Sequence, residues 1–124
     1  MDFETARQVL ASQTLPAHET QDTFLGRLRQ GMPPVPGQVT SLLLALKVIH
    51  RKLKDASTLD RELAHSLFLL TYESRNLFEA AMANRVVWPP LLDEDLERLA
   101  IAAYKIFANA PIPDTSSSSI DPPV

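Results

Sequence analysis

Apolar residues recur at intervals of three and four along most of the chain, which places them on one face of an α-helix. Five helical segments follow from this pattern: about 2–13, the stretch between Thr20 and Gly31, 36–55, 58–84 and 93–108. Long alternating apolar and polar runs are missing, as are the Asn-Gly and Asp-Gly pairs typical of β-hairpins. The pattern therefore predicts an all-α fold, a compact bundle of four to five helices.

Several expected helix ends coincide with residues that favour them. Asp2 and Thr20 carry side chains of the kind that cap a helix N-terminus. Gly31 suits the left-handed position that ends a helix, and the fixed φ of Pro36 suits a first helical turn. Asn84 is a tolerable left-handed terminator for the fourth segment.

The two longest segments, 36–55 and 58–84, are separated by a short connection. We expect them to form a long central antiparallel helix hairpin. The second of them is expected to start after Ser57 or Thr58. Its apolar stripe consists of leucines and an alanine, with Ser74 as the one polar member.

The segment 36–55 is apolar on more than one face. Its main stripe runs through Leu42, Leu46, Ile49 and Leu53, and Leu43 lies beside it. Leu44 and Val48 point roughly the opposite way. The helix is therefore expected either at the centre of the bundle or at a subunit interface.

The last two helices are joined by a stiff elbow, Trp88-Pro89-Pro90, which holds the only tryptophan. Four acidic residues open the helix that follows, where the positive end of its dipole favours anions: Asp93, Glu94, Asp95 and Glu97. We expect Trp88 to pack as a lid over the bundle end, since apolar neighbours surround it. An exposed interface anchor is the alternative, because tryptophan is enriched in binding hot spots.

Composition narrows the class of protein. The chain has 124 residues, a formal charge of −3 and no cysteine. The mild negative charge argues against binding dominated by phosphate contacts. The absence of cysteine excludes disulfides and cysteine-ligated zinc or iron–sulfur centres. Residues 1–109 are expected to form one helical domain, followed by a disordered Pro/Ser-rich tail over 110–124.

The N-terminus is acidic and lacks the basic start and apolar core of a signal peptide. The longest strictly apolar run, Leu42 to Leu46, is far too short to span a membrane. A soluble protein of the cytoplasm is the expectation.

Catalytic motifs are missing from the sequence. There is no G-x-S-x-G elbow and no phosphate-binding glycine loop. Glu62 and His65 have the Glu-x-x-His spacing of dimetal bundles, but those sites need two such motifs and this chain has one. We therefore expect no metal, no cofactor and no catalytic residue, and the chain leans away from an enzyme.

A basic stripe follows the third segment. Lys47, Arg51 and Lys54 recur at i, i+4 and i+7. They are either a docking face for an acidic partner or nucleic acid, or a solvated face whose cations suit the C-terminal end of a helix. No aromatic residue is interleaved with these cations, so nucleic acid is the less favoured partner.

Three stretches carry a family resemblance: 34–47, Glu73-Ser74-Arg75 and Trp88-Pro89-Pro90-Leu91-Leu92. Through them, residues 2 to about 108 resemble a family of short, uncharacterised cyanobacterial proteins. Some members of that family carry the label dethiobiotin synthetase, which would imply a P-loop ATPase of about twice this length. The chain has neither such a loop nor alternating β and α segments, so we expect no such activity. The resemblance implies no site residue.

Three functions stay open from the sequence. The first is a non-enzymatic interaction or assembly protein that uses the surplus apolar surface of Leu43, Leu44 and Val48, with a homodimer as one outcome. The second is a small regulator that docks an acidic protein or nucleic acid through the basic stripe. The third is a cofactor-binding or enzymatic bundle built on Glu62 and His65.

Overall fold

The computed structural model describes residues 1–110, and every regular element among them is helical. In chain order the elements are α1 (Phe3–Thr14), η1 (Pro16–His18), α2 (Phe24–Arg29), α3 (Gln38–Lys52), α4 (Arg61–Phe68), η2 (Leu69–Glu73), α5 (Ser74–Ala83) and α6 (Leu92–Phe107). The all-α prediction is confirmed. The tail expected over 110–124 lies outside the described residues, apart from Ala110.

The elements α4, η2 and α5 follow one another without a break and form one long helix with a π turn in its middle. With this helix counted once, the bundle has the five helices expected. The long helix starts at Arg61 because Asp60, rather than Ser57 or Thr58, caps it. The Asp60 carboxylate accepts a hydrogen bond from the Leu63 amide at 3.0 Å.

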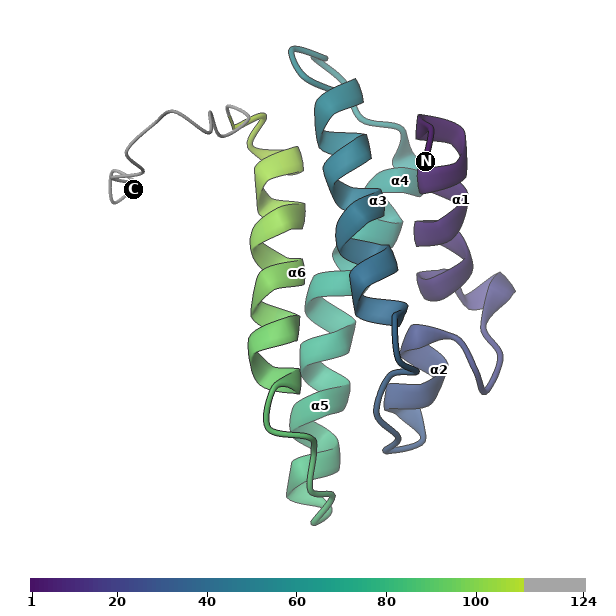
Figure 1. Cartoon of the computed structure of the whole chain (residues 1–124), viewed down its shortest axis with the longest axis vertical. Coiled ribbons are helices and arrows are strands. Elements are labelled where there is room, and N and C mark those ends of the chain that lie inside the picture. Colours follow the sequence, from purple (N-terminus) through teal and green to yellow (C-terminus); the bar gives the residue numbers. More distant parts are fainter. Residues whose placement is uncertain (111–124) are drawn as a thin grey trace.

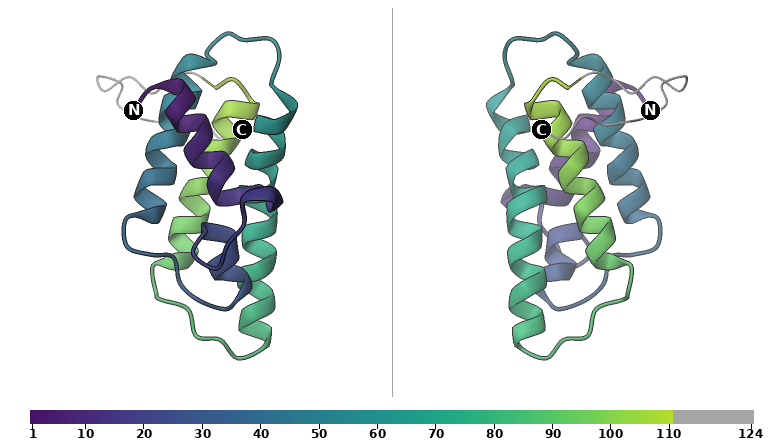
Figure 2. Two further views of the ribbon diagram at one scale, coloured as in Figure 1. Left: turned by 90° about the vertical axis from the view of Figure 1, so that its right-hand side faces the viewer. Right: turned by 90° about the vertical axis from the view of Figure 1, so that its left-hand side faces the viewer.

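The long helices of the bundle do not simply alternate in direction (Figure 1). α3 and α6 run in the same direction, while α1 and the α4–η2–α5 helix run in the opposite one. α3 packs chiefly against α1 and α6. α3 and the α4–η2–α5 helix run antiparallel, but they do not pack as the central hairpin expected from the sequence, because α1 and α6 lie between them (Figure 2).

The short helix α2 lies below α1 in the view of Figure 1, and it contacts both α1 and α5. Thr23, and not Thr20, caps it. The Thr23 hydroxyl accepts from the Gly26 amide and also donates to the Thr20 carbonyl at 2.9 Å. Gly26 lies so close to this turn that an added Cβ would come within 1.8 Å of the Thr20 oxygen. A glycine is therefore required inside α2.

Helix ends elsewhere follow the expected chemistry with two shifts. α3 does not begin at Pro36 but at Gln38, after Gly37 with φ +87°. The Asp2 carboxylate caps α1 by accepting a hydrogen bond from the Thr5 amide. This bond holds the pKa of the Asp2 carboxyl below its usual value. Gly31 ends α2 with φ +74°, as expected. The left-handed residue after α5 is Arg85 rather than Asn84.

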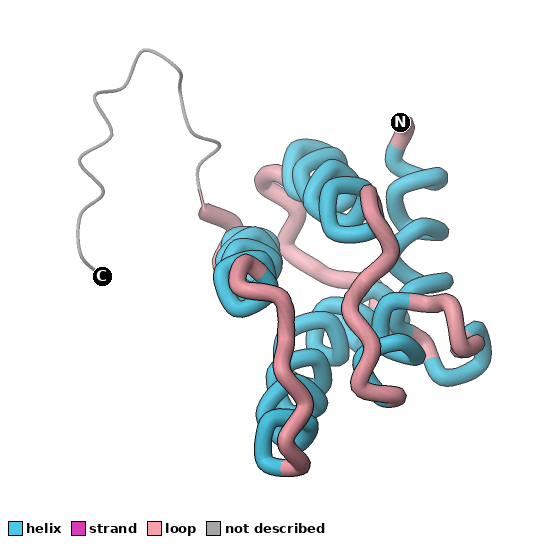
Figure 3. The backbone as a smooth tube through the Cα atoms, turned by 60° about the horizontal axis from the view of Figure 1, so that its bottom comes forward, coloured by secondary structure: helices cyan, strands magenta, loops and turns pink. Residues whose placement is uncertain are grey.

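Two long loops cross the same end of the bundle (Figure 3). One contains Pro33-Pro34-Val35-Pro36 and leads into α3, and the other contains Trp88-Pro89-Pro90 and leads into α6. Both loops therefore meet where α3 and α6 begin.

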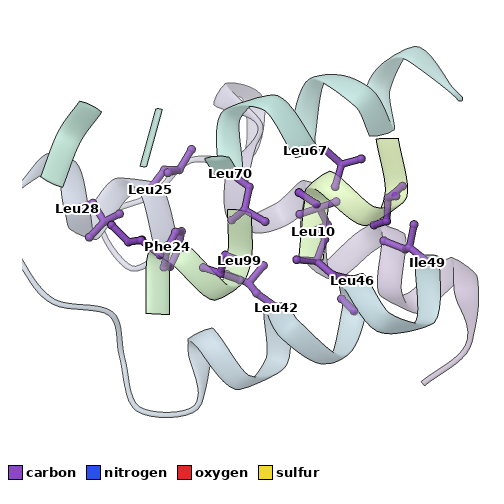
Figure 4. Close-up of a cluster of buried hydrophobic side chains, with 14 of the residues drawn as sticks. Leu10, Phe24, Leu25, Leu28, Leu42, Leu46, Ile49, Leu67, Leu70 and Leu99 are labelled. Carbon is purple, nitrogen blue, oxygen red and sulfur yellow. The ribbon is translucent and has the colours of Figure 1, made fainter. Parts of the chain in front are cut away.

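The core runs the length of the bundle, and leucine is its commonest residue (Figure 4). Each of the helices α1 to α6 contributes side chains to the core. Its fully buried members include Leu10, Phe24, Leu28, Leu42, Leu46, Ile49, Leu67, Leu70 and Leu99. Across residues 1–110, no helix is both long enough and apolar enough to cross a bilayer.

Candidate functional site

The apolar face expected on α3 is smaller than the sequence suggested. Leu43 and Val48 are partly buried and pack against the protein's own core. Leu44 alone stays largely exposed, at 47%. The expected surplus of three apolar side chains is therefore reduced, because neighbouring helices cover Leu43 and Val48 in part.

Trp88 is buried and belongs to the core, so the lid interpretation holds and the exposed anchor does not. Its ring stacks on Phe78 with centroids 5.7 Å apart, and its Nε1 donates to the Phe78 carbonyl at 2.9 Å. The Arg75 guanidinium lies over the Phe78 ring at 5.1 Å and pairs with Asp93 at 2.7 Å. The elbow is thus clamped to α5.

The basic stripe is divided by the end of α3. Lys47 and Arg51 are exposed on the helix, but Lys54 lies beyond its last residue, Lys52, in the following loop. Lys47 lines a hollow in the surface between α3 and α6. The three cations therefore do not form one continuous docking face.

Lys47 lies instead at the rim of a groove between α3 and α6, with a volume of about 360 Å³. This hollow, here called the α3–α6 groove, is defined by residues from both helices: Leu43, Leu46, Lys47, His50, Arg98, Ile101, Ala102 and Lys105. Its floor is aliphatic. Its rim carries three cations, Lys47 from α3 and Arg98 and Lys105 from α6.

A second hollow of about 380 Å³ continues the α3–α6 groove toward the loop end of the bundle. The two share Leu43 and Arg98. The second hollow is walled by Pro33 to Gly37 on one side and by Pro89 and Leu91 on the other. Both proline loops therefore shape this end of the channel.

The α3–α6 groove is electropositive in a chain whose formal charge is −3. Among the described residues that line it, none is acidic. Arg98 is paired with Asp95 on its own helix. Lys47 and Lys105 form no ion pair with any residue of 1–110, although Lys105 also lies in the last turn of α6, where a cation offsets the helix dipole.

The other end of the α3–α6 groove is closed by the chain that leaves α6. His50 is buried, and its Nε2 lies 2.7 Å from the Ala110 carbonyl. Because a carbonyl can only accept, the Nε2 carries the hydrogen. The Asp55 amide donates to Asn109 Oδ1 at 3.2 Å. Both bonds pull the chain after α6 across to α3.

Glu62 and His65 do not form a metal site. Glu62 lies 3.5 Å from Arg7 of α1 in an ion pair, and His65 is exposed on the outer side of α4. Within residues 1–110 there is no group of three or more histidine, aspartate and glutamate side chains placed to hold a metal ion. Glu62 therefore ties α4 to α1, and His65 takes no part in that contact.

Sequence reasoning missed Arg98 and Lys105. Their signal was present, since Arg98, Ile101 and Lys105 recur at i, i+3 and i+7 on one face of α6, much as the basic stripe does on α3. What the spacing could not give is which helices are neighbours. The pairing of α3 with α6 brings the two sets together.

No family model, curated protein or solved structure matches the chain.

Proposed function

We propose that this chain is a non-enzymatic protein-interaction factor that binds a segment of a partner protein in the α3–α6 groove. The observation that supports it is the combination of an aliphatic floor with the cations Lys47, Arg98 and Lys105 in an otherwise acidic chain. This is the small regulator expected from the sequence, with its docking face moved from one helix to the groove between two.

The groove suits a segment that carries both apolar and acidic side chains. Affinity would come mainly from the floor, at about 25 cal/mol for each Å² of apolar surface removed from water. The rim would contribute orientation and specificity, since exposed ion pairs are worth only about 0–1 kcal/mol each. An acidic amphipathic helix in the groove meets both requirements.

A protein segment fits this groove better than a nucleic acid does. Binding of single strands relies on aromatic side chains that stack on bases, and the residues that line the groove include none. Three cations around an aliphatic floor also offer little to a phosphate backbone. We therefore place the partner among acidic proteins of the cytoplasm.

Affinity capture with matched variants tests this function. The full chain is used as bait in three forms: unchanged, Lys47→Glu with Lys105→Glu, and Lys52→Glu with Arg61→Glu. The last pair is exposed, lies outside the groove and changes the net charge by the same amount. Quantitative mass spectrometry then compares the captured proteins, and circular dichroism checks that each bait is folded.

The proposal expects at least one acidic protein that the unchanged bait and the Lys52/Arg61 control both retain and the groove variant loses. Equal capture by all three baits would reject the groove as the binding surface. Loss with both charge variants would show that only net charge matters, and it would reject the groove as well.

A further inference from the structure

The α3–α6 groove begins where the described chain ends. His50 lines the groove, and its bond to Ala110 places residue 110 at the groove's end, over α3 rather than above α6. The bond between Asp55 and Asn109 holds the preceding residue on the same side. The last described residue of the chain therefore lies at this end of the groove.

The sequence of this segment matches the chemistry of the groove. It opens Pro111-Ile112-Pro113-Asp114 and contains a second acid, Asp121, with no lysine or arginine. An isoleucine followed two residues later by an aspartate supplies one apolar group and one anion. These are the groups that an aliphatic floor and a cationic rim accept.

The distances allow a specific register. Along α3, Leu46 lies about 6 Å and Leu43 about 10 Å from His50, at 1.5 Å per residue. An extended chain advances at most about 3.5 Å per residue, so Ile112 reaches about 7 Å and Asp114 about 14 Å beyond Ala110. Ile112 thus reaches the floor at Leu46, and Asp114 reaches the level of Leu43 and Arg98, which line the groove together. The Lys47 side chain leans toward the same level, because side chains on a helix point toward its N-terminus.

We propose that residues 111–114 of this chain occupy the α3–α6 groove, with Ile112 on its floor and Asp114 at Lys47 and Arg98. This inference rests on the groove being the binding surface proposed above and adds its regulation. A tethered segment has a high effective concentration at the site, so a partner must displace it. The tail then acts as an intramolecular competitor that excludes weakly binding segments.

Paramagnetic relaxation enhancement on the full chain tests the contact. The natural chain has no cysteine, so a nitroxide on the single substitution Ser117→Cys labels one site only. Broadening is measured at the backbone amides of Lys47 and Ile101 in the groove. Control amides are those of Arg7 and Glu62, on the α1 and α4 side of the bundle.

We expect the groove amides to broaden several-fold more than the control amides. Lys47→Glu should lower the bound-to-free ratio of the tail about twofold, the effect of one exposed ion pair. Lys47→Glu combined with Asp114→Lys should restore it, and Lys52→Glu should leave it unchanged. Equal broadening of groove and control amides, or broadening that Lys47→Glu does not alter, would overturn the proposal.

The two proposals fail separately. If the label finds the groove but no partner depends on it, the tail contact stands and the interaction function falls. If a partner depends on the groove but the label does not find it, the interaction function stands and the tail is not its competitor.

Discussion

At the scale of single residues, the structure assigns most notable side chains to architecture. Trp88 closes the loop end of the core, Gly26 permits a close turn, and Glu62 ties α4 to α1. Lys47 and Lys105 of the α3–α6 groove, in contrast, form no ion pair within residues 1–110. Trp88 and Glu62 draw attention in the sequence, yet each finds its partner within the fold.

Replacement of Trp88 separates its packing from its hydrogen bond. We expect Trp88→Ala to lower the free energy of unfolding by about 3–5 kcal/mol, the range for a large buried aromatic side chain. Trp88→Phe keeps a ring on Phe78 and loses the bond to the Phe78 carbonyl, which should cost less, about 1 kcal/mol from the hydrogen bond. Urea unfolding followed by circular dichroism measures both. Two variants as stable as the natural chain would contradict the buried position.

Gly26→Ala tests the close approach inside α2. Helix propensity alone predicts a gain of up to about 1 kcal/mol when alanine replaces glycine in a helix. The structure predicts the opposite sign, because the new Cβ would meet the Thr20 carbonyl and the Thr23 hydroxyl. We expect a loss of about 1–3 kcal/mol, the usual cost of overpacking. A stabilised variant in thermal unfolding would refute this contact.

At the scale of elements, the π turn of η2 explains the one polar member of a long apolar stripe. Ser74 is buried, and its hydroxyl donates to the Leu70 carbonyl, while the Thr71 hydroxyl donates to the Leu67 carbonyl at 3.2 Å. These bonds serve carbonyls in the widened turn. After that turn Phe78 is buried and stacks on Trp88, while Leu77 is only partly buried.

Ser74→Ala should therefore destabilise the long helix although alanine is the better helix former. We expect a loss of about 1–2 kcal/mol, since the hydroxyl is buried and hydrogen-bonded. Ser41→Ala, at an exposed position of α3, is the control and should be neutral or slightly stabilising. Chemical denaturation gives both values. The same small change at the two serines would argue against a structural role for Ser74.

Helical periodicity predicted the elements well but not their neighbours. Each of the five expected helices is present, because local spacing and capping residues act within a few positions. A helix begins at a different residue from the one expected where two residues could cap it, as with Asp60 and Ser57 before α4. The π turn and the pairing of α3 with α6 depend on contacts between distant segments, and no single helix carries that information. The groove was therefore predictable only as two separate basic stripes.

At the scale of the whole molecule, the bundle is a scaffold whose parallel pair α3 and α6 leaves one electropositive channel on an acidic protein. Both proline loops meet at one end of this channel, and His50 and Ala110 close the other. The homodimer expected from the sequence rested on Leu43, Leu44 and Val48. Leu43 and Val48 are partly buried against the core, which weakens that expectation.

We accordingly expect the isolated chain to be a monomer. Its mass by light scattering after size-exclusion chromatography should be close to 13.8 kDa over a wide concentration range. Of the three side chains on which the expected dimer rested, only Leu44 is largely exposed, and one leucine is too small an apolar patch to hold a dimer through that face. A mass near twice that value would contradict this expectation. If Leu44→Glu then lowered the mass to that of the monomer, the dimer interface would lie on α3.

Site-specific photocrosslinking tests the central claim, that the α3–α6 groove is the binding surface, most directly. Benzoylphenylalanine is placed at Ile101 in the groove or at Tyr72, which is similarly exposed on η2 and outside it. Cells that produce the full chain are irradiated, and the crosslinked peptides are identified by mass spectrometry. The groove account predicts a partner peptide with apolar and acidic residues from position 101, lost with Lys47→Glu and Lys105→Glu, and none from position 72. Crosslinks to the same partner from position 72 alone would contradict it.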